Sequence, residues 1–285
     1  MILLNRREGT VTKKEVRTIC YDSDLQVEAY TLEGIVQPFP NHFHEYYVIG
    51  YMVGGGRYLS CRNTEYILGK GDIVLFNPED NHACAQIGNE ALHYFGINVS
   101  KAVMRSLVEE VTGLGTLPRF RQNVVSDEEL ACCIGPLHES IMAGSGEFEK
   151  EELLLLMISL LLQRYCDPFE ECTADCPSEI EKTCKFIEEH FAESVSLEQL
   201  CACARLSKSA LLRAFTKAKG ITPYRYLQTV RVEAAKKLLE QGAPLLDAAL
   251  QTGFSDQSHF TKFFSMFIGL APGVYRDIFR DKSPR

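Results

Sequence analysis

Apolar and polar positions change their period along this chain, and the change separates two kinds of secondary structure. In the first hundred residues, short runs rich in β-branched and aromatic residues are separated by turn segments at 54–56, 68–71 and 77–81. Short runs broken at regular intervals are typical of the strands of a β-sandwich or barrel. The predicted strands span residues 27–31, 44–53, 57–62, 73–76 and 93–99.

From residue 100 onward the apolar positions recur at helical spacing, which predicts helices at 100–112, 126–142 and 147–165. The third of these is apolar on nearly every side, as expected of a helix buried on several sides. One side can pack beneath the barrel, and a bare opposite side would be unusual on a monomer. We therefore expect this helix to be both a core helix and the contact of a homodimer. One face holds Leu153, Leu156, Met157, Leu160 and Leu161, and the opposite face holds Leu154, Leu155, Ile158 and Leu162.

The last hundred residues carry one structural unit twice. Each copy is a predicted short helix, a tight turn and a longer helix, followed by a glycine and a proline; the copies span 196–223 and 244–272. Ser196 and Gln199 form a capping-box pattern, and Ser207 and Gly220 are placed to cap the two ends of the longer helix. A helix from about residue 224 to 241 joins the copies and would be about 27 Å long. This is the pattern of two helix-turn-helix units.

Residues 196–276 resemble the DNA-binding domain of the AraC/XylS family of transcriptional regulators. The resemblance rests on the run Gly-Phe-Ser-Asp-Gln-Ser-His-Phe at 253–260, followed by Pro272 and Tyr275-Arg276. It implies two helix-turn-helix subdomains joined by a long helix, and base contacts from the second helix of each. The DNA-contacting residues that we expect are Ser207, Lys208, Ser209, Leu212, Arg213 and Lys217 in the first unit, and Gln257, Ser258, His259 and Lys262 in the second.

Charge favours nucleic acid as the partner of the back half only. The chain has a net charge of −8, divided between −12 over residues 1–177 and +4 over 178–285. Residues 205–237 hold nine bases and one acid, whereas residues 238–273 hold one base and three acids. Because phosphate neutralisation supplies most non-specific affinity for DNA, the first unit should dominate binding. Ser265 and Met266 stand where the family usually has basic residues, which also predicts a weaker second unit.

The front half contains His42-Phe43-His44 and a segment from Gly71 to His82 that resemble the cupin-type sensor domain of the same family. Alternation along a strand would place His42, His44 and Tyr46 on one face, where His82 could join them. These four residues are our candidates for binding a small polar effector. A purely structural role, with each ring bonded to the backbone, is the alternative.

Three imidazoles are also enough to hold a divalent metal ion with an open coordination position, so His42, His44 and His82 are candidate metal ligands. However, Val48 and Ile49 stand where metal-binding cupins have a carboxylate. We therefore expect no resident cofactor, with a divalent metal in the cupin-like domain as the alternative.

The expected fold class is α+β. Residues 1–166 form a cupin-like β-barrel with following helices, for sensing and dimerisation; 167–178 form a linker; and 179–285 form an all-α double helix-turn-helix domain. No apolar run is long enough to span a membrane, and the eleven cysteines lack zinc spacing, so we expect free thiols and a cytoplasmic location.

The predicted function is that of a sequence-specific transcription regulator, not an enzyme, whose promoter binding is controlled by a small-molecule effector. Its expected partners are promoter DNA, the effector, a second copy of the chain and RNA polymerase. One alternative is a cupin-type metal-dependent enzyme, such as a dioxygenase, fused to a DNA-binding module. Another is a dimerisation scaffold that binds no ligand.

Overall fold

The computed structural model describes residues 15–88, 90–144, 146, 148–167, 177–268 and 270–280. The chain divides into two compact units, and the fold class is α+β, as predicted. The first unit comprises Met1–Val108, Gly115–Ser145 and Leu160–Pro168; the second comprises Glu109–Leu114, Gly146–Ser159 and Phe169–Arg285. Most of the expected linker, residues 168–176, lies outside the described residues, and its last two residues begin a helix at Pro177.

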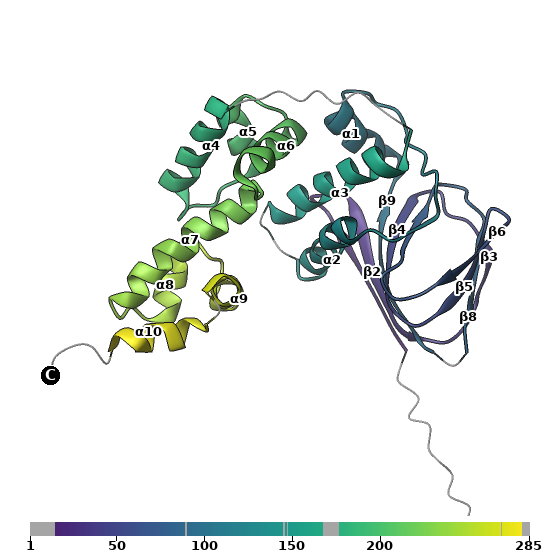
Figure 1. The fold of residues 1–285 in the computed structure, drawn as a ribbon, viewed down its shortest axis with the longest axis horizontal. Coiled ribbons are helices and arrows are strands. Elements are labelled where there is room, and N and C mark those ends of the chain that lie inside the picture. Colours follow the sequence, from purple (N-terminus) through teal and green to yellow (C-terminus); the bar gives the residue numbers. More distant parts are fainter. Residues whose placement is uncertain are drawn as a thin grey trace, which may run out of the picture. The chain divides into compact units, whose positions relative to one another are not determined.

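The first unit is built on two antiparallel sheets that face each other, confirming the expected β-rich, cupin-like architecture (Figure 1). The larger sheet contains β1 (Val16–Asp22), β2 (Val27–Ile35), β9 (Leu92–Val99), β4 (Tyr47–Gly54), β7 (Ile73–Phe76) and β10 (Val124–Val125), in that spatial order. The smaller sheet contains β3 (Phe39–His42), β8 (His82–Gln86), β5 (Arg57–Cys61) and β6 (Thr64–Leu68).

Alternation along the strands decides which side chains face the interior. On β5, Arg57, Leu59 and Cys61 are buried, whereas Tyr58, between Arg57 and Leu59, is 50% exposed. The same two-residue period puts Val48 and Met52 of β4 into the cluster of buried apolar residues between the sheets. The predicted run 44–53 is wrong at its start, because β4 begins only at Tyr47. Strands β1, β3, β6, β8 and β10 were not predicted.

Three helices follow the strands: α1 (Lys101–Thr112), α2 (Glu128–Met142) and α3 (Glu149–Tyr165), each within about two residues of its predicted bounds. Asp127 caps α2 by accepting the Leu130 N–H at 3.0 Å. Its carboxylate also accepts hydrogen bonds from Arg164 and Tyr165 of α3. Burial alone would raise the pKa of the Asp127 carboxyl, but these hydrogen bonds hold its pKa at about 2. The carboxylate is therefore ionised, and it links α2 to α3.

Helix α3 is largely buried within a single chain. Leu154, Leu155, Ile158 and Leu162 are at most 4% exposed, and so are Met157 and Leu161. The expected dimer face is therefore wrong in two of its members, because Met157 and Leu161 pack inside the chain. Leu153, Leu156 and Leu160 are only partly buried and form a narrower stripe at helical spacing.

The second unit includes the two predicted helix-turn-helix copies. Its helices are α4 (Pro177–His190), α5 (Leu197–Ala204), α6 (Lys208–Lys219), α7 (Pro223–Glu240), α8 (Leu245–Gln251), α9 (Gln257–Ile268) and α10 (Pro272–Arg280). The capping box of Ser196 and Gln199 is confirmed, as are the Ser207 cap and the left-handed Gly220, with φ of 72°. Helix α7 agrees with the predicted 224–241 to within one residue at each end.

The tight turns of the two copies use different residues for the same left-handed geometry. Arg205 ends α5 with φ of 56°, and Gly253 follows α8 with φ of 82°. A Cβ atom on Gly253 would lie 2.6 Å from the Phe191 carbonyl oxygen, so only glycine fits the second turn. No helix in the described part of the chain combines the length and the apolar composition that a membrane span needs.

Candidate functional site

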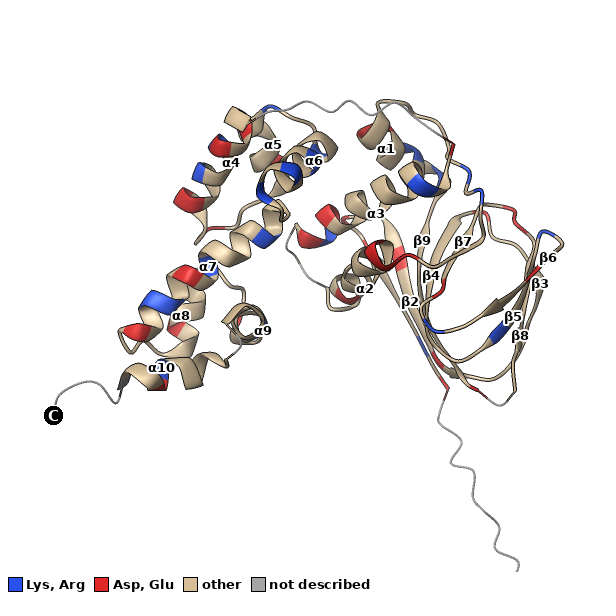
Figure 2. Ribbon diagram, viewed as in Figure 1, with Lys and Arg blue, Asp and Glu red and all other residues tan. Residues whose placement is uncertain are grey.

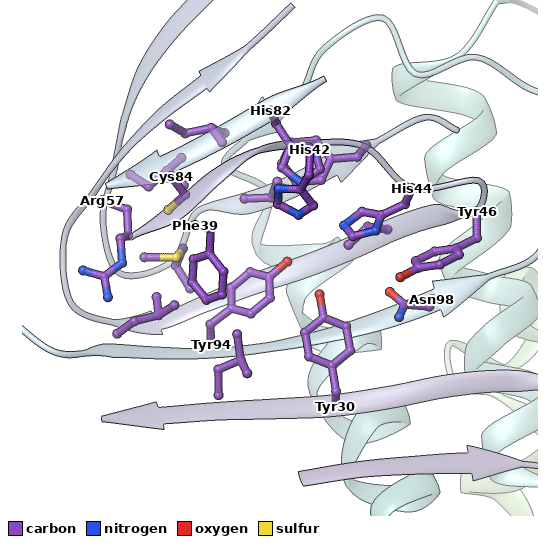
Figure 3. Close-up of a pocket in the computed structure, with 18 of the residues that line it drawn as sticks. Tyr30, Phe39, His42, His44, Tyr46, Arg57, His82, Cys84, Tyr94 and Asn98 are labelled. Atoms are coloured by element: carbon purple, nitrogen blue, oxygen red, sulfur yellow. The ribbon is translucent and has the colours of Figure 1, made fainter. Parts of the chain in front are cut away.

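A cavity of about 300 Å³ lies between the two sheets of the first unit (Figure 3). Its wall is mostly apolar, with Leu32, Met52, Leu59, Leu68 and Leu92 among the lining residues. Side chains with polar atoms also line it, and they come from both sheets and from the segment that joins β3 to β4. They are Glu28, Tyr30, His42, His44, Tyr46, Arg57, His82, Cys84, Tyr94 and Asn98. An apolar cavity with a few converging polar groups is the usual form of a small-molecule site.

The four predicted effector-binding residues converge on this cavity. The ring centroids of His42 and His82 are 4.4 Å apart, and those of His42 and His44 are 4.9 Å apart. Tyr46 stacks on His44 with a centroid separation of 4.8 Å. The predicted grouping of the four residues is therefore confirmed.

The predicted alternation of His42, His44 and Tyr46 along one strand is wrong. Of His42, His44 and Tyr46, only His42 lies in a strand, at the end of β3; His44 and Tyr46 precede β4. The chain crosses here from the smaller sheet to the larger one, and His82 opens β8 directly opposite His42 in register. The side chains meet because of this crossing and this strand pairing, not because they alternate along one strand.

Backbone carbonyl groups fix the orientation of two of the histidines. The Nδ1 atom of His42 is 2.7 Å from the Pro40 oxygen, and that of His82 is 2.9 Å from the Asp80 oxygen. A carbonyl oxygen can only accept, so both Nδ1 atoms carry the hydrogen and both Nε2 atoms are acceptors in the neutral rings. Burial lowers the pKa of His82 to about 4, and burial together with His42 lowers the pKa of His44. His44 and His82 are therefore neutral near pH 7.

The three imidazoles fit a divalent metal ion. One ligand atom from each of His42, His44 and His82 lies within 4.8 Å of the others, and no carboxylate joins this group among the described residues. A metal-bound histidine usually donates its other ring N–H to an oxygen, as His42 and His82 do here. The Asp80 carboxylate next to this group is occupied by the Asn77 and Asn123 side-chain amides. The donor set is thus three nitrogens with at least one open position.

A pair of glycines shapes the opposite wall of the cavity. Gly50 of β4 and Gly96 of β9 are register partners in the larger sheet. A Cβ atom would lie 1.6 Å from the Tyr94 hydroxyl oxygen at Gly50, and 2.7 Å from the Tyr30 ring at Gly96. The two tyrosine rings therefore lie where side chains would otherwise stand. Burial raises the pKa of Tyr94 to about 12 and also raises that of Tyr30, so both present neutral hydroxyls.

Sequence reasoning missed Tyr30, Tyr94 and Arg57. The glycines within two strands could have indicated a close approach to the sheet. A single arginine at the first inward position of the run 57–61 could have indicated a buried charge.

The predicted DNA-contacting residues of the first helix-turn-helix differ in exposure. Lys217 is exposed, whereas Arg213 is partly exposed and its Nη1 atom is buried with no hydrogen-bond partner. Leu212 is only 1% exposed because it belongs to the core. Ser209 is 2% exposed, and its hydroxyl donates to the Glu110 carbonyl oxygen at 2.7 Å within the same unit. In this conformation neither Leu212 nor Ser209 is presented for base contact.

Two cations of this region are already engaged within the second unit. Lys208, the first residue of α6, forms ion pairs with Glu151 and Glu198. Arg231 is buried and donates to the Phe191 and Glu193 carbonyl oxygens. Figure 2 shows the remaining Lys and Arg positions along α6 and α7. The basic run therefore offers fewer charges to phosphate than its sequence suggests.

The second helix-turn-helix presents its predicted residues more openly. Gln257, Ser258 and Lys262 are exposed on α9, and His259 is partly exposed. Asp256 caps α9 by accepting the His259 N–H at 2.8 Å. The predicted residues thus lie along the first turns of the second helix of the motif, the region that enters the major groove in helix-turn-helix proteins.

Comparison with known proteins gives matches for both units. Residues 25–161 match the AraC-like ligand binding domain, and residues 200–278 match a helix-turn-helix domain. The chain is 48% identical over 248 residues to a protein of Bacillus subtilis (strain 168) named "Uncharacterized HTH-type transcriptional regulator YbfI"; the match covers 87% of this chain and 90% of that protein.

Two more distant proteins extend the comparison. The arabinose operon regulatory protein of Escherichia coli (strain K12) is 24% identical over 81% of this chain and 80% of its own. The DNA-binding domain of AdpA, solved in complex with a target DNA, is 28% identical over 39% of this chain and 99% of its own, with a TM-score of 0.35.

Proposed function

Because the chain belongs to the AraC family of helix-turn-helix transcriptional regulators, with an AraC-like ligand-binding domain before its DNA-binding domain, we propose that a small molecule in the barrel cavity controls its binding to promoter DNA. The observation that carries this proposal is the convergence of His42, His44, Tyr46 and His82 on a largely apolar cavity between the sheets. The protein would act in the cytoplasm, where promoters and RNA polymerase are found, and it would bind the effector without converting it.

A continuous set of contacts leads from the cavity wall to α3. The Tyr30 carbonyl oxygen accepts a hydrogen bond from His138 Nε2 of α2 at 3.2 Å. Asp127 at the start of α2 accepts from Arg164 and Tyr165 at the end of α3, each at 2.8 Å. Residues Gly146–Ser159 belong to the second unit, so α3 is a helix that both units share. Suppose that β2, which carries Tyr30, can take two positions. An effector that binds more tightly to one of them would shift the equilibrium toward that position and so shift α3, because only a difference in affinity shifts an equilibrium.

The proposal is tested by a thermal-shift screen of metabolites against the full chain. A ligand that binds only the folded state raises the unfolding temperature. We expect the active compound to lose its effect in His44→Ala and to retain it in His93→Ala, because His93 lies outside the cavity lining. If an active compound protects both variants equally, it binds elsewhere, and the cavity is not the effector site.

We also propose that the three histidines hold a divalent transition metal ion. His42, His44 and His82 would supply the nitrogen ligands, and the ion would supply a Lewis acid able to bind an oxygen atom of the effector. The neutral rings of His44 and His82 and the two Nδ1–H bonds of His42 and His82 to carbonyl oxygens support this assignment.

The metal proposal predicts a visible absorption spectrum for the chain loaded with Co²⁺, together with a rise in unfolding temperature. His44→Ala should weaken Co²⁺ binding by at least about tenfold, because one of three ligands is lost. His93→Ala is the matched control and should bind as the unmodified chain does. Equal Co²⁺ affinity in both variants would contradict the site, and turnover of a substrate by the loaded chain would favour the enzyme alternative.

Two substitutions on α6 separate base recognition from phosphate binding. Arg213→Ala should cost about 1–3 kcal/mol at one base position and relax specificity there, because arginine can contact guanine O6 and N7 together. Lys217→Ala should weaken all sequences alike, since a phosphate contact carries no sequence information. The measurement is the dissociation constant for a duplex selected from a random library and for its single-base variants. If both substitutions weaken all of these duplexes to the same extent, the assignment of Arg213 is wrong.

The dimer is proposed through the partly exposed stripe of Leu153, Leu156 and Leu160, which would bring two DNA-binding domains to neighbouring half-sites. Leu156→Glu should give a folded monomer. Leu155→Glu should instead unfold the chain, because Leu155 is 2% exposed and a charge there has no partner. Sedimentation and circular dichroism distinguish these outcomes. A monomeric unmodified chain at micromolar concentration, with and without DNA, would exclude the dimer.

A further inference from the structure

We propose that the effector is a small organic anion whose carboxylate is bound by Arg57 and whose body is apolar. This inference rests on the proposed function, since it names the chemical class of the molecule that the cavity would bind. It follows from the position of one buried cation, from the partners that this cation has, and from the charge at the other end of the cavity.

Arg57 occupies an interior position of the smaller sheet. It is the first residue of β5 and faces the same way as Leu59 and Cys61. Tyr58, the next residue after Arg57, points outward. The Arg57 residue is 1% exposed, and it lines the cavity. A strand position that ordinarily holds an apolar side chain therefore carries a guanidinium group.

Carbonyl oxygens hold this guanidinium without neutralising it. Its Nη2 donates to the Ile35 oxygen, and its Nη1 lies 3.3 Å from the Gly56 oxygen and 3.5 Å from the Glu90 oxygen. These carbonyls take at most three of the five N–H donors, and Nε is buried with no hydrogen-bond partner. No carboxylate of the described residues forms an ion pair with it.

The charge on Arg57 remains despite its surroundings. Burial lowers the pKa of the guanidinium, but arginine is not deprotonated in proteins. A buried charge without a counterion is costly, whereas a carboxylate with two coplanar oxygens can pair with a guanidinium through charge-assisted hydrogen bonds. An anionic ligand would thus be stabilised at the very group that is least satisfied in the cavity wall.

Glu28, the acidic residue of the cavity lining, is hydrogen-bonded to Asn98 and not to Arg57. The Glu28 carboxylate accepts a hydrogen bond from Asn98 Nδ2 at 2.7 Å, and it helps to raise the pKa of Tyr46. In Figure 3, Asn98 and Tyr46 lie at one end of the view and Arg57 at the other, with the histidines between them. The cavity therefore has a negative end and a positive end, and an anion is favoured only at Arg57.

The walls near Arg57 determine the rest of the ligand. Phe39, Met52, Leu59 and Leu92 line the cavity and offer no charge. A ligand with a single negative charge balances the single cation, whereas a dianionic phosphate would introduce one charge that the described lining does not pair. We therefore assign a monocarboxylate with an aliphatic or aromatic body, such as a medium-chain or aryl-substituted acid.

The test compares acids with their neutral amides on the full chain. The probes are octanoate with octanamide, and 4-phenylbutyrate with 4-phenylbutyramide, which differ mainly in charge. We expect each acid to bind at least about tenfold more tightly than its amide, as measured by calorimetry and by the rise in unfolding temperature. Amides that bind as tightly as the acids would overturn the inference, and so would the absence of binding by all four compounds.

Variants identify Arg57 as the group that recognises the anion. Arg57→Gln can still donate to the carbonyl oxygens but carries no charge, so the preference for acid over amide should vanish. Arg17→Gln removes an exposed arginine outside the cavity lining and should retain the preference. If Arg57 only supports the fold, acid and amide will weaken together and their ratio will stay the same, which would overturn the assignment.

A third variant applies if Arg57→Gln fails to fold. Arg57→Lys keeps the positive charge and should keep a preference for the acid, and its loss in a folded Arg57→Lys chain would contradict recognition by charge. The outcome for the proposed function is separate. Equal binding of acids and amides would contradict the assignment of an anion but not control by an effector. An affinity for the operator that responds to no cavity ligand would contradict control by an effector.

Discussion

The cavity exists because two glycines are register partners in β4 and β9. With no side chain at Gly50 or Gly96, the rings of Tyr94 and Tyr30 lie against the sheet instead of being pushed into the space between the sheets. The histidines approach from the other side, because the chain crosses between the sheets after β3 and because His82 pairs with His42. A cavity in place of a continuous core is therefore a consequence of backbone geometry, and the polar groups around it are positioned before any ligand binds.

Those polar groups differ in charge, so that one end of the cavity is positive and the other is negative. His44 and His82 are held neutral by burial, and hydrogen bonds to carbonyl oxygens orient His42 and His82. Arg57 and Glu28 carry the opposite charges of the lining, and the contacts that hold them do not join them to each other. A ligand that pairs with Arg57 and packs against the apolar wall must therefore be amphipathic. In the second unit, Ser209 contacts Glu110, so DNA contact by Ser209 requires that this hydrogen bond be released.

Local features could be predicted from the sequence, and features that depend on distant pairing could not. The Ser196 capping box, the Gly220 cap and the bounds of α7 depend on neighbouring residues, so sequence alone located them. His42, His44 and His82 were grouped by their resemblance to a sensor domain, but the argument from strand alternation was wrong because the strand ends at His42. Arg57, Tyr30 and Tyr94 were missed, since their convergence depends on the pairing of β2, β9 and β4 in one sheet and of β5 with β8 in the other, which no local pattern records. The burial of Leu212 and Ser209 was missed because it, too, depends on contacts with distant parts of the chain.

The central claim is that occupancy of the cavity changes the affinity for DNA. It is tested most directly by the dissociation constant of the full chain for its selected operator, measured with and without a saturating ligand that His44→Ala no longer binds. Coupling between two sites typically changes affinity by about 5- to 150-fold. The account predicts a change of that size in the unmodified chain and none in His44→Ala. An identical dissociation constant with and without the bound ligand would contradict it.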